Sequence, residues 1–184
     1  MDPVTALVVI DMQRGIMARP TIHPTTSVLA QVVTLVDAFR EHFHPVVLVN
    51  VGFSIGAPDM LRPRADVKAP VAEVPADFSE LMPELRANDA TDILVTKRQW
   101  GAFYGTDLDL QLRRRRVTGI VLCGISTSIG VESTARAAFE HGYNLTFASD
   151  AMTDMSAEAH ENALTRIFPR IGEVDTTAAI IGKL

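Results

Sequence analysis

The chain has 184 residues, of which 47% are hydrophobic and 21% charged, and its 22 acidic and 17 basic residues give a formal net charge of −5. This acidic balance excludes the basic footprint of a nucleic-acid-binding protein, and the single cysteine, Cys123, excludes a disulfide framework and a cysteine-rich zinc site. The length indicates one domain over residues 1–184. The chain shows no signal-peptide pattern and no apolar run long enough to span a membrane, so we expect a cytoplasmic protein without a membrane partner.

Six segments of the chain have the pattern of strands in a buried sheet. Five are short apolar runs rich in β-branched residues, which is typical of parallel strands that are covered on both faces. They span residues 4–10, 45–51, 92–96, 119–123 and 145–149, and a sixth, shorter strand is expected near residues 172–174.

Helical periodicity fills the intervals between these strands. The predicted helices span residues 27–42, 107–116, 129–141 and 156–167, and a last helix starts at Thr176. We expect one of residues 25–27, two threonines and a serine, to cap the first helix, and Gly142 to end the third. The run from Arg113 to Arg116 closes the second helix, where cations complement the negative end of the helix dipole.

Strands that alternate with helices of this length imply right-handed βαβ crossovers. The fold class is therefore α/β, a three-layer α/β/α sandwich with a mainly parallel sheet. Ligands of such sheets bind beyond the carboxyl ends of the strands, so the residues that follow each strand are where we expect chemistry. The irregular, proline-rich segment 52–91 is expected to wall a pocket or to meet a partner subunit.

Two charged residues stand at these strand ends. Asp11 ends the first apolar strand, where a carboxylate is costly unless it is paired, hydrogen-bonded or exposed in a cleft. Lys97 follows the third strand and is one of three lysines in a chain with 14 arginines. Taken alone, Asp11 could be a strand-end residue that caps a loop, and Lys97 could be a strand-end residue that faces solvent. The small residues 124–130 add a strand-to-helix turn whose backbone N–H groups suit a carboxylate or an oxyanion.

Three motifs follow one another along the chain. They are Val-Val-Ile-Asp-Met-Gln at residues 8–13, Thr-Lys-Arg at residues 96–98, and Gly-Ile-Ser-Thr-Ser-Ile-Gly-Val-Glu at residues 124–132. Together they resemble the isochorismatase-like hydrolases, a superfamily that includes nicotinamidases and carbamoyl-amide hydrolases. The resemblance implies a six-stranded parallel sheet of order 3-2-1-4-5-6, a non-proline cis peptide at Ile125–Ser126, and a homo-oligomer, either a dimer or a tetramer.

The resemblance also implies a catalytic trio of aspartate, lysine and cysteine, and these roles fall on Asp11, Lys97 and Gly130. A glycine offers no nucleophile, so covalent cysteine catalysis at this position is excluded. Cys123 lies earlier, inside a predicted strand, where a free cysteine is expected to be part of the core. The serines of the same turn are nearer, but the sequence places no histidine to activate them.

Glycine also stands at this position in the true isochorismatases, and the resemblance implies that they use the aspartate as a general acid. Protonation of a vinyl-ether carbon, followed by addition of water, needs a proton donor and an orienting cation, which Asp11 and Lys97 can supply. The leading hypothesis is a hydrolase of a small carboxylated molecule that uses no covalent nucleophile. Two alternatives stay open: a catalytically inactive ligand-binding or assembly protein on the same fold, and an amidase with a substitute serine nucleophile.

Substrate contacts are predicted around the same strand ends. The backbone donors of the family map onto the amides of Ser126 and Gly130. Aromatic rings beyond the second and third strands suit a planar ligand, and an arginine there suits a carboxylate. The predicted substrate-binding residues are Gln13, Phe53, Arg98, Trp100, Ser126 and Ser128.

We expect no cofactor and no metal ion. The chain has neither a Gly-x-Gly-x-x-Gly fingerprint nor a P-loop, which argues against nucleotide binding. Metal-dependent nicotinamidases carry an Asp-x-His pattern after the second strand, whereas residues 50–53 are Asn-Val-Gly-Phe, and the five histidines form no ligand cluster. One geometric condition must be met: Lys97 has to span about 10 Å to reach Asp11 from two strands away.

Overall fold

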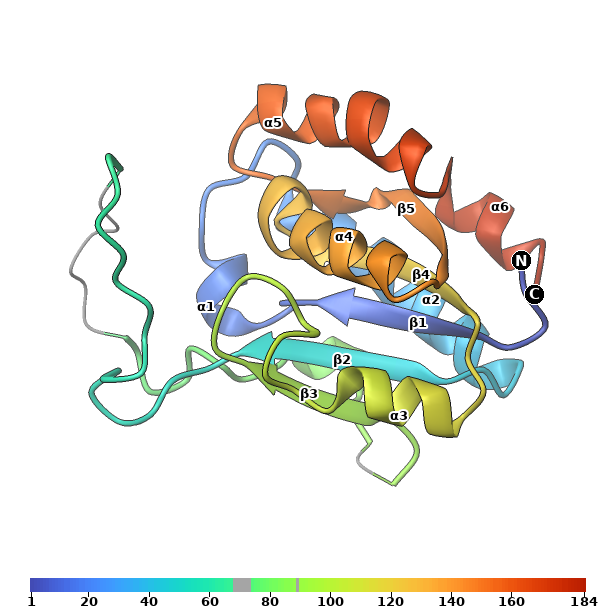
Figure 1. Ribbon diagram of the computed structural model, residues 1–184, viewed down its shortest axis with the longest axis horizontal. Helices are drawn as coiled ribbons and strands as arrows, with labels where there is room; N and C mark the ends of the chain where they lie inside the picture. The colour runs from blue at the N-terminus through green and yellow to red at the C-terminus, as the bar shows by residue number, and fades with distance from the viewer. Residues whose placement is uncertain (68–73, 89) are drawn as a thin grey trace.

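A parallel sheet forms the centre of the molecule (Figure 1). The computed structural model describes residues 1–67, 74–88 and 90–184. The strand order β3-β2-β1-β4-β5-β6 confirms the predicted topology and the α/β class. The strands are β1 (Thr5–Ile10), β2 (Val46–Val51), β3 (Ile93–Lys97), β4 (Gly119–Ile125), β5 (Asn144–Thr153) and β6 (Glu173–Asp175).

Helices cover both faces of this sheet. They are α1 (Arg14–Met17), α2 (Thr25–Glu41), α3 (Leu108–Arg114), α4 (Glu132–Glu140), α5 (Ala157–Asn162) and α6 (Thr177–Ile181). Apolar residues of α2 and α6 pack on one face, and those of α3 and α4 pack on the other. This arrangement is the predicted three-layer sandwich. None of the helices in the described parts of the chain is long and apolar enough to cross a membrane.

Two predicted helix starts differ from the observed ones. The expected side-chain cap of α2 among residues 25–27 is wrong: the helix begins at Thr25, and the residue before it, Pro24, has no side-chain donor or acceptor to offer. The predicted helix 129–141 begins earlier as a π turn, η2 (Thr127–Val131), which continues into α4. Its predicted end is confirmed, because Gly142 has a left-handed φ of 82° directly after the helix.

The strands at the centre of the sheet are fully buried, as the apolar runs predict. All residues of β1 and β4 are buried, and Cys123 lies in the core cluster between the sheet and α2. Burial raises the pKa of the Cys123 thiol well above its usual range, so this sulfur stays protonated and unreactive. The prediction that Cys123 belongs to the core is confirmed.

A close approach of β1 and β4 brings the η2 turn over the end of β1. Gly124 lies opposite Ile10 with a φ of 114°, and a Cβ atom there would stand 2.1 Å from the Ile10 carbonyl oxygen. Only glycine fits this position. The peptide bond that follows, Ile125–Ser126, is cis, as the resemblance implies.

The segment that follows β2 leaves the body of the molecule and returns to it before β3 (Figure 1). Its return is fixed by a 3₁₀ turn, η1 (Pro83–Leu85), and by an isolated antiparallel bridge between Gln13 and Leu81. The segment is irregular, as predicted; its residues 68–73 and 89 lie outside the described residues.

Candidate active site

Asp11 and Lys97 form a buried ion pair at the carboxyl end of the sheet. Asp11 follows β1 directly, and Lys97 is the last residue of β3, two strands away. The Lys97 Nζ atom nevertheless lies 2.8 Å from Asp11 Oδ2, because its side chain crosses the end of β2 beneath the surface. The same ammonium donates a hydrogen bond to the Trp100 carbonyl oxygen at 2.5 Å. The lysine therefore meets the geometric condition set by the sequence.

The Asp11 carboxyl has an unusual proton affinity. Burial raises its pKa to about 6, although the nearby Lys97 ammonium acts in the opposite direction. Its second oxygen, Oδ1, is buried and has no hydrogen-bond partner among the described residues. A carboxyl that is only half satisfied in a dry site holds its proton more tightly than one in water. Asp11 can therefore carry a proton near neutral pH and release it to a neighbour.

Gly130 faces this pair from the η2 turn. A Cβ atom built on Gly130 would lie 3.3 Å from Asp11 Oδ2 and 3.3 Å from Lys97 Nζ. It would also lie 2.9 Å from the Ile10 Cγ2 methyl group, which is closer than side chains normally approach. The structure thus brings the three predicted residues together, and the position without a side chain is the one that points at both charges.

The hydroxyl groups of the η2 turn are held by residues that the sequence did not single out. Ser128 donates two hydrogen bonds to Asp154 Oδ2, from its backbone N–H at 2.7 Å and from its hydroxyl at 2.8 Å. Thr127 Oγ1 lies 2.8 Å from Nδ1 of the buried His160. The sequence gave no signal for Asp154, because the predicted strand ends at residue 149 whereas β5 runs on to Thr153. The histidine that the sequence could not locate is therefore beside the turn, but it contacts Thr127 and not Ser128.

Two of the predicted substrate-binding residues also make hydrogen bonds within the protein. Gln13 is fully buried; its amide donates to the Val51 and Phe78 carbonyl oxygens and accepts from the Val51 N–H. Arg98 donates to the Gly52 carbonyl oxygen at 2.7 Å and pairs with Asp59 at 3.1 Å. Both side chains hold the segment after β2 against the sheet, and the Arg98 side chain remains 46% exposed. Their predicted contact with a substrate stays a prediction.

The predicted aromatic walls divide into packed and exposed rings. Phe53 packs against Phe78, with ring centroids 6.2 Å apart, and Phe103 is buried beside Tyr143. Trp100 contributes its carbonyl oxygen to Lys97, whereas its ring is exposed. Trp100 is therefore the exposed aromatic residue that follows Lys97 most closely in the sequence.

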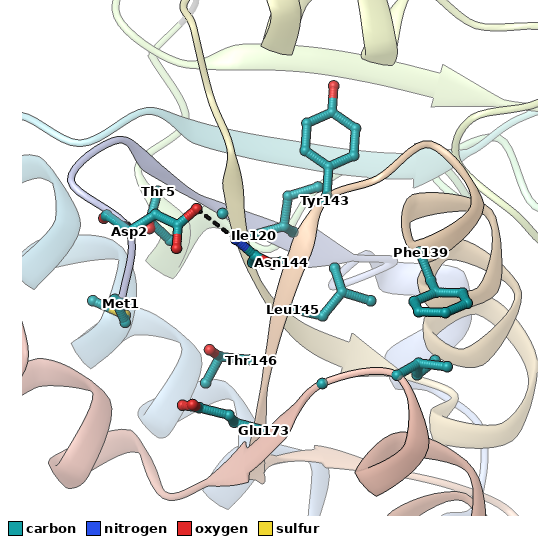
Figure 2. A pocket seen from close by; sticks show the side chains of 13 residues that line it. Met1, Asp2, Thr5, Ile120, Phe139, Tyr143, Asn144, Leu145, Thr146 and Glu173 are labelled. Atoms are coloured by element: carbon teal, nitrogen blue, oxygen red, sulfur yellow. Dashed lines mark hydrogen bonds between the residues drawn. The ribbon is translucent and has the colours of Figure 1, made fainter.

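Two further observations bear on cofactors and cavities. Among residues 1–67, 74–88 and 90–184, no three His, Cys, Asp or Glu side chains are grouped to hold a metal ion. A cavity of about 350 Å³ lies at the amino ends of β4 and β5, where Asp2 accepts a hydrogen bond from Asn144 (Figure 2). The cavity lies at the amino ends of the strands, whereas Asp11 lies at their carboxyl ends, so the cavity is not part of the Asp11 site.

Known proteins resemble this chain over almost its whole length. Residues 5–179 match the Isochorismatase domain family. An uncharacterised isochorismatase family protein of Bacillus subtilis (strain 168), YwoC, is 53% identical over 182 residues, which cover 98% of this chain and 94% of that protein. The structure of an isochorismatase family protein from Burkholderia thailandensis superposes with a TM-score of 0.95 at 43% identity, covering 99% of this chain and 96% of that one. N-carbamoylsarcosine amidase from Thermoplasma acidophilum superposes with a TM-score of 0.76 at 27% identity, covering 95% and 96%.

Proposed function

Because the chain belongs to the isochorismatase family of hydrolases, we propose that it hydrolyses a small carboxylated substrate by acid–base catalysis without a covalent nucleophile. Asp11 acts as the general acid and Lys97 as the cation that orients it. The substrate bond that fits such catalysis is a vinyl ether, because its hydrolysis starts with protonation of carbon and needs no attack by a protein side chain.

The observation that carries this proposal is the buried Asp11–Lys97 pair facing a glycine. The Asp11 pKa of about 6 gives an acid that is partly protonated near neutral pH and strong enough to donate. Gly130 offers no group that could form a covalent intermediate. A buried ion pair with one unpartnered oxygen is also costly to keep, which argues against a scaffold with no chemistry.

The reaction proceeds in two steps that balance. Asp11 transfers its proton to the vinyl-ether carbon, and the carboxylate that remains is stabilised by the Lys97 ammonium at 2.8 Å. Water then adds to the oxocarbenium ion, loses a proton that returns to Asp11, and the resulting hemiketal collapses to a carbonyl compound and an alcohol. The Ser128, Ile129 and Val131 N–H groups of the η2 turn already donate within the protein. The N–H groups of Ser126 and Gly130, the donors that the resemblance implies, can bind the substrate carboxylate during both steps.

The test compares Asp11→Asn with Asp37→Asn, a change in an exposed carboxylate that pairs with Arg86 at the surface. We expect the wild-type chain to hydrolyse a carboxylated vinyl ether from a substrate panel, and Asp11→Asn to lose about 100-fold or more of that rate. Asp37→Asn should keep the wild-type rate. Equal turnover by Asp11→Asn and the wild type would contradict the proposal, because no other residue is offered as the acid.

An amidase with a serine nucleophile is the alternative that the same panel addresses. In that case amides would be hydrolysed instead, and a trapped acyl group would be found by mass spectrometry on Ser128. The hydrogen bonds from Ser128 to Asp154 argue against this role, since one carboxylate oxygen accepts both its hydroxyl and its backbone N–H. The cytoplasmic location and the homo-oligomeric state remain predictions.

A further inference from the structure

Phe43, in the turn between α2 and β2, is an exposed aromatic residue in a backbone conformation that favours glycine. Its φ angle is 58°, and the residue is 96% exposed. The turn closes α2 by two backbone hydrogen bonds, from the Phe43 N–H to the Arg40 carbonyl oxygen at 3.1 Å and from the His44 N–H to the Phe39 carbonyl oxygen at 2.9 Å. This pattern is the Schellman motif, in which the left-handed residue is usually glycine.

The same motif closes two other helices and shows what is ordinary at this position. At the end of α4 the left-handed residue is Gly142, whereas at the end of α3 it is Arg116, with a φ angle of 57°. A residue with a Cβ atom loses stability in this conformation, because the Cβ atom approaches the following carbonyl oxygen. Phe43 recovers none of that loss by packing, since its ring is in water. A strained residue without packing contacts is a candidate for contact with a ligand.

The Phe43 ring lines a hollow at the amino ends of β2 and β3. The volume of the hollow is about 560 Å³, within the range of small-molecule pockets. His44 lines it beside Phe43, and Arg115 lines it from the end of α3. The ion pair between Arg40 and Asp92 also lines it, but both groups are saturated by hydrogen bonds within the protein. The groups left for a ligand are therefore an aromatic ring, an imidazole and a guanidinium.

Arginine side chains dominate the charge around this hollow. Arg115 has no carboxylate partner among the described residues; its Nη1 atom donates to the Gln111 carbonyl and side-chain oxygens at 3.0 and 2.8 Å. Its neighbours Arg114 and Arg116 are exposed and likewise make no ion pair within the described parts of the chain. Glu41, at the end of α2, does not line the hollow. Three full positive charges exceed the partial negative charge of the helix ends, so an anion is favoured here.

Phe43 and Arg115 together match a planar anion. Aromatic rings stack on one another, and a guanidinium group pairs with a carboxylate through parallel N–H donors. We propose that the hollow binds a small aromatic carboxylate, whose ring stacks on Phe43 and whose carboxylate pairs with Arg115. His44 can donate a further hydrogen bond to the same carboxylate. The hollow lies at the opposite end of the strands from Asp11, so this inference does not rest on the proposed reaction.

The first experiment titrates the isotope-labelled full chain with benzoate and follows the backbone amide signals by NMR. We expect saturable shifts at Phe43, His44 and Arg115, which line the hollow. Cyclohexanecarboxylate, which has the same charge and no aromatic ring, should bind there about fivefold more weakly. Benzoate shifts that are confined to the η2 turn, or equal affinity for the two carboxylates at the hollow, would overturn the proposal.

The second experiment separates binding from folding. Phe43→Gly removes the ring and supplies the residue that the turn favours, so the unfolding temperature should rise while the affinity for benzoate falls about fivefold. Arg115→Gln should lower the affinity about fivefold as well, with little change in stability. Arg166→Gln is the matched control, because this exposed arginine of η3 is outside the lining and should keep the wild-type affinity.

Both test residues are exposed, so we expect both variants to fold, which circular dichroism checks. An unchanged benzoate affinity in either variant would overturn the proposal. A Phe43→Gly chain that unfolds at a lower temperature than the wild type would overturn it too, because Phe43 would then serve the turn and not a ligand.

Discussion

Two buried carboxylates at opposite ends of the same sheet show how an ion pair can serve stability or chemistry. Asp92, at the amino end of β3, accepts from Arg40 through both oxygens, at 3.2 and 2.6 Å, and its Oδ2 also accepts the Asn88 N–H at 2.9 Å. Asp11, at the carboxyl end of β1, has one cation on Oδ2 and nothing on Oδ1 among the described residues. The first carboxylate is saturated, whereas the second keeps an oxygen free for a proton.

The number of hydrogen bonds, and not burial alone, separates these two sites. A bidentate guanidinium and a backbone donor hold the Asp92 charge in place and leave no oxygen to react. A single ammonium leaves Asp11 with a pKa raised to about 6 by burial. The comparison teaches that an incompletely satisfied buried carboxylate is the better candidate for catalysis.

The largest expected effect is on the pH dependence of turnover. Because Asp11 must be protonated to act as the acid, the rate should be constant at low pH and fall tenfold per pH unit above about 6. Turnover at pH 8 should therefore be about 100-fold below the plateau. Rates measured from pH 5 to 9 check this; a rate that rises through pH 6 to 8 would mean that Asp11 acts as a base.

The same pKa fixes the sign of a stability effect. The native chain binds the Asp11 proton more tightly than the unfolded chain, because its pKa is raised from 3.8 to about 6. This contribution to the free energy of unfolding is complete below pH 4 and is lost as the pH rises through about 6.

A smaller effect is expected at the saturated pair, and it should appear in stability only. Asp92→Asn breaks the bidentate contact with Arg40 and should lower the free energy of unfolding by about 2–3 kcal/mol, measured by urea titration. Asp37→Asn, whose partner Arg86 is exposed, should cost less than about 1 kcal/mol. The folded Asp92→Asn chain should keep the wild-type turnover. A loss of activity would contradict the view that Asp92 serves stability alone and Asp11 serves catalysis.

The smallest of these effects concerns the space opposite Asp11. Gly130→Ala puts a methyl group 2.9 Å from Ile10 Cγ2, so we expect a loss of about 1–3 kcal/mol in the free energy of unfolding. Gly101→Ala is the control, since the nearest atom to a Cβ there is the Ser133 carbonyl oxygen at 3.5 Å. Thermal unfolding of both variants gives the comparison. If the two variants were equally stable, the η2 turn would accommodate the added methyl group without loss of stability, which would contradict the prediction.

The sequence predicted the members of the buried ion pair better than the hydrogen bonds of the residues around it. Asp11, Lys97 and Gly130 could be predicted because each stands in a motif at a strand end, and the parallel sheet brings strand ends together. Gln13 and Arg98 stand in the same motifs, but their partners lie in the irregular segment after β2, whose path no periodicity reveals.

Asp154 and His160 were missed for a related reason. They hold the η2 turn by hydrogen bonds from the residue that follows β5 and from α5, parts of the chain that no motif linked to the site. The start of α2 was mispredicted because the helix begins at Thr25, so that Pro24, which has no side-chain hydrogen-bonding group, takes the N-cap position and residues 25–27 lie inside the helix.

The contact at Gly130 also constrains how this chain could acquire different chemistry. Two of the four glycine codons become a cysteine codon by a single nucleotide change, and a thiol at this position would stand opposite Asp11 and Lys97. The Ile10 methyl group that lies 2.9 Å from that position must move before the new side chain can fit. A smaller side chain at position 10 would relieve this contact, so we expect a thiol at position 130 to cost less stability after such a change than before it.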